Sequence, residues 1–385
     1  MNRTLARRSV ATLLSLTALA MVAPAVQASD SEHDHGDRHG KHRDHGHQGH
    51  WHGKHGKAVV TVMTRNLYLG TDLIRIATAP TLAEFEARAT AGFEQVRATD
   101  FPARARLIAR EIRRTNPDVI GLQEAALWRT GPKDGTATPA MEVEYDYVRI
   151  LLRALRRIGL DYEVAHSTDE ADIEGPTSGD FDVRLTMRDV VLVDDDTKGL
   201  DVEGSGGANY ATRLPLPTVA GVFTVLRGYA YADLELRGRD FRFVNTHLEA
   251  FADPIRVGQA QELVAPGGPL AGDRLIVVGD MNSDPNGAGG SPPTAWLVLT
   301  AAGLIDVWPA LYPGDPGYEC CLRTDSLTDP PSPSPFDHRI DQIFVRGDVR
   351  PLNAKIVGTD PARSRTRSGL WASDHGGVVA KLKLK

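Results

Sequence analysis

The stretch Ile276-Val-Val-Gly-Asp-Met-Asn282 decides the fold, because an apolar strand runs into Gly279 and then presents two polar side chains. Side chains alternate between the two faces of a β-strand, so Asp280 and Asn282 point the same way at the end of this strand. The pattern predicts that the strand end forms part of an active site.

Five further apolar segments end in polar residues in the same way. They lead to Asn66, to Gln123 and Glu124, to Asn245 and His247, to Asp341, and to Asp374 and His375. Six such segments in one chain are hard to attribute to chance, and they favour a single site built from several strand ends.

In type and order, these residues resemble the endonuclease/exonuclease/phosphatase superfamily. The resemblance covers the chain from about Val59 to the end, and each motif is weak alone but specific in this order. It implies an α/β fold, a four-layer α/β sandwich with two packed mixed β-sheets flanked by helices. It also implies phosphoester hydrolysis, as in pancreatic-type deoxyribonucleases, abasic-site endonucleases, neutral sphingomyelinases and inositol polyphosphate phosphatases. The motifs say little about which ester is cut.

The resemblance assigns the metal and the water to particular residues. Glu124 is expected to be the principal carboxylate ligand of Mg²⁺ or Mn²⁺, with Asn66 beside it and Asp374 bound directly or one layer behind. Asp280 is expected to orient the attacking water or accept its proton, and Asn282 to hold a phosphoryl oxygen.

The resemblance also assigns the histidines. His375 is expected to contact the scissile phosphate as a base or charge stabiliser, and Asp341 to fix its tautomer. His247 is the candidate acid for the leaving oxygen, and Asn245, on the same strand face, is expected to bind substrate. His166 and His338 have no such neighbours in sequence and are predicted to be structural.

The arginines of the chain depart from the family pattern at one position and provide one further candidate site for binding phosphate. The family commonly carries an arginine at the end of the strand that corresponds to 190–193, where this chain has Asp194. Arg363, Arg365 and Arg367 alternate upstream of Asp374. On a loop over the site they would bind a substrate phosphate, and the alternative is that they are solvated surface charge.

The first 28 residues are predicted to be a secretory signal peptide. They contain three arginines, an apolar stretch over 10–22 and a small-residue cleavage site that ends at Ala28. General secretion fits better than twin-arginine export, and the apolar run is too short to favour a transmembrane anchor. We therefore expect a secreted protein, periplasmic or extracellular, after cleavage near Ala28.

A His-rich leader is predicted at 29–57, because nine of the 13 histidines lie there among Gly, Asp and Lys. It is expected to be disordered and solvated, or alternatively to bind transition metals such as Zn, Cu or Ni. Residues 58–385 are expected to form one catalytic domain, and the protein to be a monomer.

Charge and composition bear on the substrate. The chain has a formal charge of −6, and loss of the three arginines of the signal makes it −9. An acidic protein is a poor general polyanion binder, so a phospholipid or other small diester is favoured. Thr246-His-Leu248, followed by Arg256 and Gln259, also resembles the sphingomyelinase branch. An extracellular nuclease is the first alternative. The second is a non-enzymatic protein that sequesters metal through its leader, although the chain keeps every motif residue.

Coarse patterns predict the remaining elements. Helices are expected at 82–96, 102–114, 147–158, 254–263 and 294–302, and strands at 58–65, 188–193 and 221–236. The acidic segment 167–181 is expected to be a loop, and 204–207 a turn. Cys320 and Cys321, the only cysteines, are expected either to form a vicinal disulfide or to remain thiols.

Overall fold

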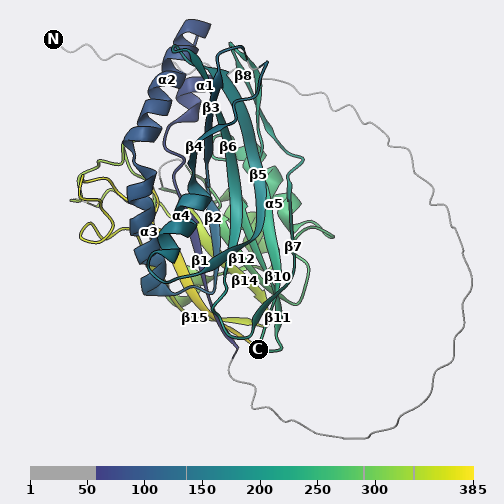
Figure 1. Cartoon of the computed structure of the whole chain (residues 1–385). Helices are drawn as coiled ribbons and strands as arrows, with labels where there is room; N and C mark the ends of the chain where they lie inside the picture. Colours follow the sequence, from purple (N-terminus) through teal and green to yellow (C-terminus); the bar gives the residue numbers. More distant parts are fainter. Residues whose placement is uncertain (1–57, 136, 289–290, 333) are drawn as a thin grey trace, which may run out of the picture. The chain divides into compact units, whose positions relative to one another are not determined.

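A computed structural model describes residues 58–135, 137–288, 291–332 and 334–385 (Figure 1). The predicted signal (1–28) and leader (29–57) lie outside these described residues.

The first β-sheet has eight strands, and two parallel strands at its centre lead to the site. β1 (Val59–Asn66) runs parallel to β2 (Val119–Gln123), so Asn66 lies beside Gln123 at one edge. Antiparallel neighbours extend the sheet on both sides. They are β16 (Gly377–Leu384) and β15 (Val349–Val357) next to β1, and β6 (Phe181–Asp194), β3 (Leu127–Pro132), β4 (Glu142–Asp146) and β5 (Tyr162–Pro176) beyond β2.

The second β-sheet has six strands and repeats this arrangement. β11 (Asp240–His247) runs parallel to β12 (Arg274–Asp280), and antiparallel strands flank the pair. The flanking strands are β14 (Asp341–Gly347) and β13 (Ile305–Asp306) on one side, and β10 (Gly228–Leu236) and β7 (Leu200–Asn209) on the other. Both sheets are therefore mixed.

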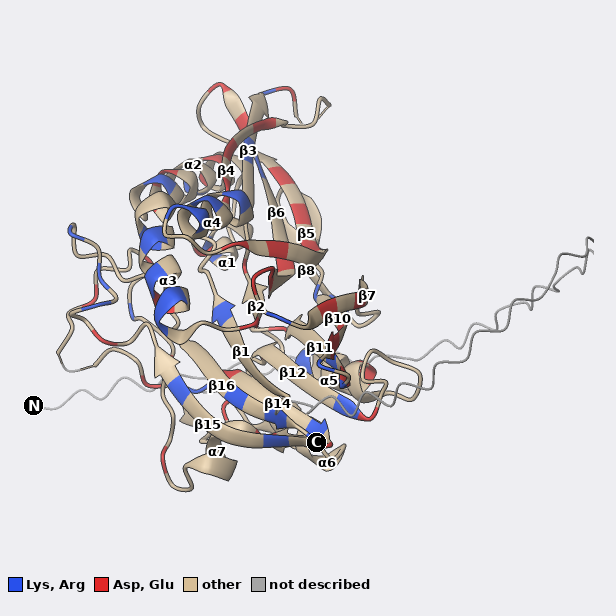
Figure 2. Cartoon of the chain, turned by 60° about the horizontal axis from the view of Figure 1, so that its bottom comes forward, with Lys and Arg blue, Asp and Glu red and all other residues tan. Residues whose placement is uncertain are grey.

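The two sheets pack face to face, with helices on the outer face of each. One apolar core between the sheets includes Val62, Phe243 and Val278. A second core lies between the first sheet and α2 (Leu82–Ala98), α3 (Phe101–Thr115) and α4 (Tyr147–Arg156), and a third between the second sheet and α5 (Asp253–Val264) and α6 (Thr294–Ala301). Figure 2 shows the two groups of helices on opposite sides of the strands. The predicted four-layer α/β sandwich is confirmed.

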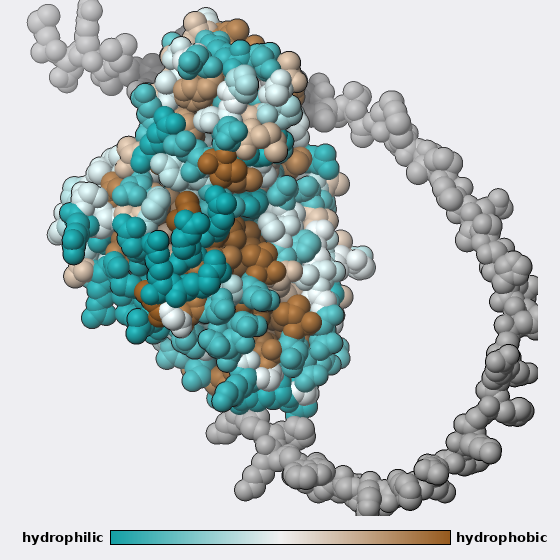
Figure 3. Space-filling view, viewed as in Figure 1, coloured by the Kyte–Doolittle hydropathy of each residue, from teal (hydrophilic) through white to brown (hydrophobic). Residues whose placement is uncertain are grey.

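Strands at the centre read as continuous apolar runs because both of their faces are covered. In β12, Ile276 and Val278 face the other sheet, whereas Leu275 and Val277 face the helices. The outer surface of the domain is mainly hydrophilic in the view of Figure 3, as expected for helices that bury one face only.

The helices begin and end at sequence signals. The hydroxyl of Thr81 accepts the amide N–H of Glu84 at the start of α2. Asp100 caps α3, where Pro102 lies in the first turn, and Asn116 ends it in a left-handed conformation. Each of the five predicted helices is present within three residues of its expected ends. Two short helices, α1 (Leu73–Ala77) and α7 (Val307–Leu311), were not predicted.

Two predictions of irregular structure were wrong. Most of segment 167–181, predicted as a loop, belongs to β5, which pairs with β6 through two register shifts. These shifts break the period of two, and the acidic side chains are matched by arginines, since Asp172 pairs with both Arg129 and Arg184. Residues 204–207, predicted as a turn, lie in β7. A Cβ on Gly206 would come within 2.9 Å of the ring of Tyr231, so close packing explains this glycine.

The predicted strand 221–236 is interrupted. It divides into β9 (Gly221–Val225), which forms a separate hairpin with β8 (Leu214–Thr218), and β10 of the second sheet. Leu226 and Arg227 lie in the break, and this irregularity places Arg227 at the site.

Candidate active site

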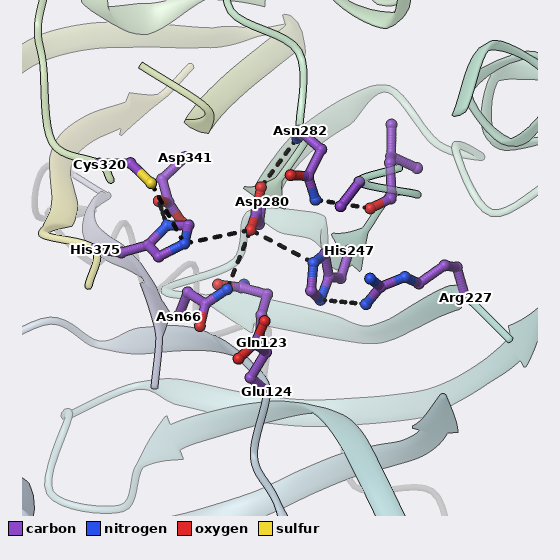
Figure 4. A network of polar contacts seen from close by, with 12 residues as sticks. Asn66, Gln123, Glu124, Arg227, His247, Asp280, Asn282, Cys320, Asp341 and His375 are labelled. Carbon is purple, nitrogen blue, oxygen red and sulfur yellow. Dashed lines mark hydrogen bonds and ion pairs between the residues drawn. The ribbon is translucent and has the colours of Figure 1, made fainter. Parts of the chain in front are cut away.

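The ends of the strands from both sheets meet at one edge of the sandwich. His247 of β11 is level with Asp280 of β12, which is level with Asp341 of β14. His375 precedes β16, and Asn66 ends β1 in the facing sheet. Figure 4 shows Asp341, His375, Asp280, His247 and Arg227 in a row.

Gly279 makes the Asp280 strand end possible. Its φ is 150°, and a Cβ there would overlap the carbonyl oxygen of Thr246 on the neighbouring strand. Only glycine avoids that overlap, so β11 and β12 approach closely where His247 and Asp280 emerge.

Asp280 is the centre of the cluster. Its Oδ2 accepts the Nδ2–H of Asn66 at 3.1 Å and lies 3.4 Å from Nε2 of His247 and 3.9 Å from Nε2 of His375. Its Oδ1 accepts the backbone N–H of Asn282 at 3.0 Å. Burial raises the pKa of Asp280 to about 7, although the positive charge of His375 opposes that rise. A carboxylate with this pKa suits a general base at neutral pH.

His375 is held as a cation by its neighbours. Its Nδ1 lies 2.6 Å from Oδ2 of Asp341, and its Nε2 lies 3.9 Å from Oδ1 of Asp374. Burial alone would lower the pKa of His375, but the charges of Asp341 and Asp374 raise it well above its ordinary value. The geometry fits an imidazolium that faces developing negative charge.

His247 has the opposite character. Nη1 of Arg227 lies 2.9 Å from its Nδ1, and an arginine can only donate, so Nδ1 is the acceptor and the ring proton is on Nε2. Burial lowers the pKa of His247 well below its ordinary value, and the charges of Arg227 and His375 lower it further. The ring is therefore neutral, and its Nε2–H points to Asp280.

Arg227 was missed by sequence reasoning. It is 5% exposed, and its Nε lies 3.9 Å from Oε2 of Glu249. Its charge also lowers the pKa of the buried carboxyls of Glu170 and Asp189, which burial raises well above their ordinary values. Arg227 precedes a strand with an ordinary sequence pattern, so nothing in its local sequence marks it. The one available signal was that the family commonly carries an arginine at the end of a strand. Asp194 occupies the position where that arginine was expected, but it lies at the end of β6 away from the site, level with Asp118. Arg227 is therefore the arginine that reaches the site.

Glu124, Asn66 and Asp374 form the candidate metal centre. Oε2 of Glu124 accepts the N–H of Leu69 at 2.7 Å. Burial and the charge of Asp374 raise the pKa of Glu124. A cation between these two carboxylates would remove their repulsion, and an all-oxygen donor set suits Mg²⁺ or Mn²⁺. Asn66 is already engaged, because its Oδ1 accepts the N–H of Tyr68 at 2.9 Å.

A second group of carboxylates lies behind His375. Glu319, Asp341 and His375 each place a ligand atom within 4.8 Å of the others, and all three are buried. Oε1 of Glu319 accepts the N–H groups of Ile340 and Asp341, at 2.6 and 2.8 Å. Burial and the charge of Asp341 raise the pKa of Glu319 well above its ordinary value. Because Oε1 of Glu319 is held by backbone N–H groups and Oδ2 of Asp341 is held by Nδ1 of His375, this cluster fits a support for His375 better than a catalytic metal centre.

The two asparagines differ in position. Asn282 lines the cavity of the site, with its Nδ2 donating to the carbonyl of Leu248 at 2.9 Å. Asn245 is fully buried between the sheets, where its Nδ2 donates to Leu122 and Val190 and its Oδ1 accepts from Gln123 at 2.5 Å. The structure thus places Asn245 beneath the site, in a role that joins the two sheets.

The arginines at 363–367 do not line the cavity. Arg363 pairs with Asp360 at 3.4 Å, and Arg365 lies over the ring of Trp371 and donates to the carbonyl of Gly369. His338 pairs with Asp337, and burial lowers the pKa of the half-buried His166. Neither histidine belongs to the cluster.

Cys320 and Cys321 form a disulfide, one of the two states expected from the sequence. Sγ of the buried Cys320 lies 3.5 Å from Nε2 of His375, and Cys321 lines the cavity. The pair is therefore part of the wall around His375.

Comparison with known proteins agrees with this geometry. Residues 85–375 match the model of the Endonuclease/Exonuclease/phosphatase family. The chain belongs to this family. Enzymes of the endonuclease/exonuclease/phosphatase family hydrolyse phosphoesters and typically use divalent metal ions.

Solved structures share the fold at low identity. An endonuclease/exonuclease/phosphatase family protein from Bacteroides thetaiotaomicron is 18% identical with a TM-score of 0.52, and covers 86% of this chain and 99% of its own. A family protein from Leptotrichia buccalis is 16% identical with a TM-score of 0.51, at 84% and 99% coverage. A mannosyl-6-phosphatase from Bacteroides thetaiotaomicron is 18% identical with a TM-score of 0.52, at 84% and 99% coverage. No curated protein matches the chain.

Among the described residues, none of the helices is both long enough and apolar enough to cross a membrane.

Proposed function

We propose that the protein is a secreted phosphodiesterase that uses Mg²⁺ or Mn²⁺ and attacks phosphorus directly with water. The observation that carries the proposal is Asp280, a buried carboxylate with a pKa of about 7 between two histidines of opposite character. The phospholipid or other small diester expected from the sequence is the favoured substrate class.

Each side chain has a distinct part in this reaction. Asp280 orients the water and accepts its proton as the oxygen attacks phosphorus. His375, a cation beside Asp341, stabilises negative charge on the phosphoryl oxygens. The neutral Nε2–H of His247, which faces Asp280 in the free protein, would donate to a phosphate oxygen or the leaving oxygen when the substrate is bound.

Glu124 and Asp374 would hold the divalent cation, with Asn66 beside them. When bound, the cation would neutralise charge on the phosphate and help the leaving oxygen depart. Asn282 faces the cavity next to Asp280 and is placed to contact a phosphoryl oxygen.

The direct test is hydrolysis of bis-p-nitrophenyl phosphate and p-nitrophenyl phosphate in Mg²⁺, with Asp280→Asn as the test variant. Asp273→Asn is the control, because Asp273 is exposed and directly precedes β12, at the end of the strand away from Asp280. We expect wild type and the control to prefer the diester, and Asp280→Asn to lose at least about a hundredfold in turnover. Preference for the monoester, as in a phosphatase, would contradict the diesterase assignment.

An extracellular nuclease is the second candidate, and the surface of α3 and α4 favours it. Exposed arginines gather on these two adjacent helices and at the C-terminal cap of α4, in blue in Figure 2: Arg106, Arg110, Arg113, Arg114, Arg149, Arg153, Arg156 and Arg157. A basic face of this kind suits a polyanion even on an acidic protein. Cleavage of plasmid DNA that falls steeply with added salt, and that replacement of Arg110 and Arg153 by Gln weakens, would support this candidate.

Secretion is tested separately. In a secreting host, the N-terminus of the mature protein should lie near Ser29, and Edman sequencing of the exported chain identifies it. An exported protein that retains residues 1–28 would contradict the signal-peptide prediction.

A further inference from the structure

A large apolar cavity continues from the catalytic cluster into the protein. It has a volume of about 460 Å³, which is within the usual range for small-molecule sites. One end is lined by Glu124, His247, Asp280, Asn282, Asp374 and His375, so it opens on the catalytic groups. The rest of the cavity is not needed for the water attack described above.

The walls away from the catalytic groups are hydrocarbon. Phe93, Trp128 and Leu185 form the inner part, and each is at most 3% exposed. Half-buried side chains of α1 line another wall, including Ile74 and Ile76. An aliphatic and aromatic lining of this extent binds apolar groups by removing them from water.

The β8–β9 hairpin covers part of this cavity. Leu216 and Phe223 face each other across the hairpin, and both line the cavity. At the rim, Val222 is 72% exposed and Phe251 is 60% exposed. Large apolar side chains that stand in water at the mouth of an apolar cavity indicate that the ligand entering there is itself apolar.

Charge argues against a polynucleotide in the same place. Among the described residues that line the cavity, the cationic side chains are Arg227 and His375, whereas six are acidic: Asp72, Glu124, Glu174, Asp280, Asp325 and Asp374. A nucleic acid needs cations along its backbone, and a cavity with this balance repels every phosphate except one held by a metal. An uncharged hydrocarbon chain meets no such repulsion.

We propose that this cavity binds the alkyl or acyl chain of an amphiphilic phosphodiester, under the β8–β9 hairpin, while the phosphate lies at Asp280. The inference rests on the proposed phosphodiesterase function and adds the part of the substrate that gives specificity. Each methylene that enters the cavity should raise kcat/KM by up to about fourfold, which corresponds to ~0.8 kcal/mol.

The test uses p-nitrophenyl phosphodiesters whose second ester is methyl, butyl or octyl, below their micelle concentrations and in saturating Mg²⁺. We expect kcat/KM of the wild-type protein to rise steeply from methyl to octyl. Leu216→Gln should flatten that rise and leave methyl ester hydrolysis within about twofold. Leu214→Gln is the matched control, since Leu214 lies on the same strand, is half-buried and is not in the lining.

The outcomes separate this inference from the proposed function. Hydrolysis of the methyl ester with no dependence on chain length would overturn the chain-binding cavity and leave the phosphodiesterase assignment intact. A preference for the p-nitrophenyl ester of thymidine 5′-phosphate over the octyl ester would overturn it in favour of a nucleotide.

A binding measurement keeps the inference testable without turnover. Fluorescence of cis-parinaric acid should increase on binding to the wild-type protein and to Leu214→Gln, and octyl phosphate should displace it. Val222→Gln, at the exposed rim, provides a second variant that does not disturb the fold, and both it and Leu216→Gln should weaken the binding. Equal binding by all four proteins would contradict the proposal.

Discussion

Nη1 of Arg227 lies 2.9 Å from Nδ1 of His247, and both side chains are buried. This contact sets the tautomer of His247, because the guanidinium can only donate. It makes His247 a neutral hydrogen-bond donor toward Asp280, whereas His375 on the other side of Asp280 is a cation.

Replacing Arg227 by Met should release this constraint. The pKa of His247 should rise, since Arg227 is one of the charges that lower it, and turnover should fall by roughly a hundredfold because the donor is no longer oriented. Nitrogen-15 NMR of labelled histidine reports both the tautomer and the pKa. Arg242→Met is the control, as Arg242, five residues before His247 on β11, pairs with Asp233. Unchanged His247 signals in Arg227→Met would contradict the tautomer assignment.

The lowered pKa of His247 also makes the fold sensitive to acid. The unfolded chain takes up a proton at His247 near its ordinary pKa, about 6.5, whereas the folded protein does so only at lower pH. The stability that the neutral ring contributes is therefore present above about pH 6.5 and is lost as the pH falls through the folded pKa.

His247→Gln should remove this contribution to acid sensitivity. The free energy of unfolding, from urea denaturation at pH 7 and pH 5, should fall less on acidification for the variant than for the wild-type protein. A larger fall in His247→Gln would show that His247 is protonated in the folded state.

The position of Asn245 predicts a stability defect without a binding defect. Asn245→Ala removes hydrogen bonds to Leu122 and Val190 and leaves Nε2 of Gln123 without its acceptor, so we expect a loss of about 2 to 4 kcal/mol in unfolding free energy. KM for a small diester should stay within about twofold. Asn353→Ala, at an exposed position on β15, should cost less than about 0.5 kcal/mol. A raised KM with normal stability would show that Asn245 binds the substrate, as expected from the sequence, and would contradict the structural role.

The polar residues at the strand ends could be predicted from the sequence, because each one directly follows the apolar run that forms its strand. Asp280, His247 and His375 each follow an apolar run, and parallel or antiparallel pairing brings such ends to one edge. Asn245 has the same local pattern but lies one step deeper, where Gly121 leaves room for it between the sheets. The alternation of apolar and polar residues predicts which face of a strand a side chain is on. It does not predict how deep between the sheets that side chain lies.

Contacts between segments that are far apart in the sequence could not be predicted from the sequence. Arg227 reaches His247 through a break between two strands, and the apolar cavity is assembled from α1, β5, β6 and the β8–β9 hairpin. Each of these segments has an ordinary pattern by itself. The acidic segment of β5 has the composition of a loop when taken alone, because the arginines that pair with it, Arg129 and Arg184, lie elsewhere in the sequence.

The arginines at 363–367 should be dispensable for small substrates. Arg363 is exposed beside Asp360, and Arg365 lies over Trp371 outside the cavity. Changing Arg363, Arg365 and Arg367 to Ala should leave KM for bis-p-nitrophenyl phosphate within about twofold. If the protein cleaves DNA and these arginines bind it, KM for DNA should rise and its salt dependence should flatten. A large rise in KM for the small diester would place the arginines at the phosphate.

Glu124 and His375 are expected to have separate roles, one at the metal and one at the phosphate. Glu124→Gln keeps the shape of the ligand and removes its charge, so affinity for Mg²⁺ should fall and high Mg²⁺ should partly restore turnover. His375→Ala keeps the metal ligands and removes the cation that faces the phosphate.

The decisive measurement is turnover of bis-p-nitrophenyl phosphate as a function of Mg²⁺ concentration for both variants, with Mg²⁺ binding followed by calorimetry. We predict normal Mg²⁺ binding by His375→Ala, a loss of turnover on the order of a hundredfold and no rescue by Mg²⁺. Near wild-type turnover by His375→Ala, or Mg²⁺ binding by Glu124→Gln that equals that of the wild-type protein, would contradict the assignment of this site.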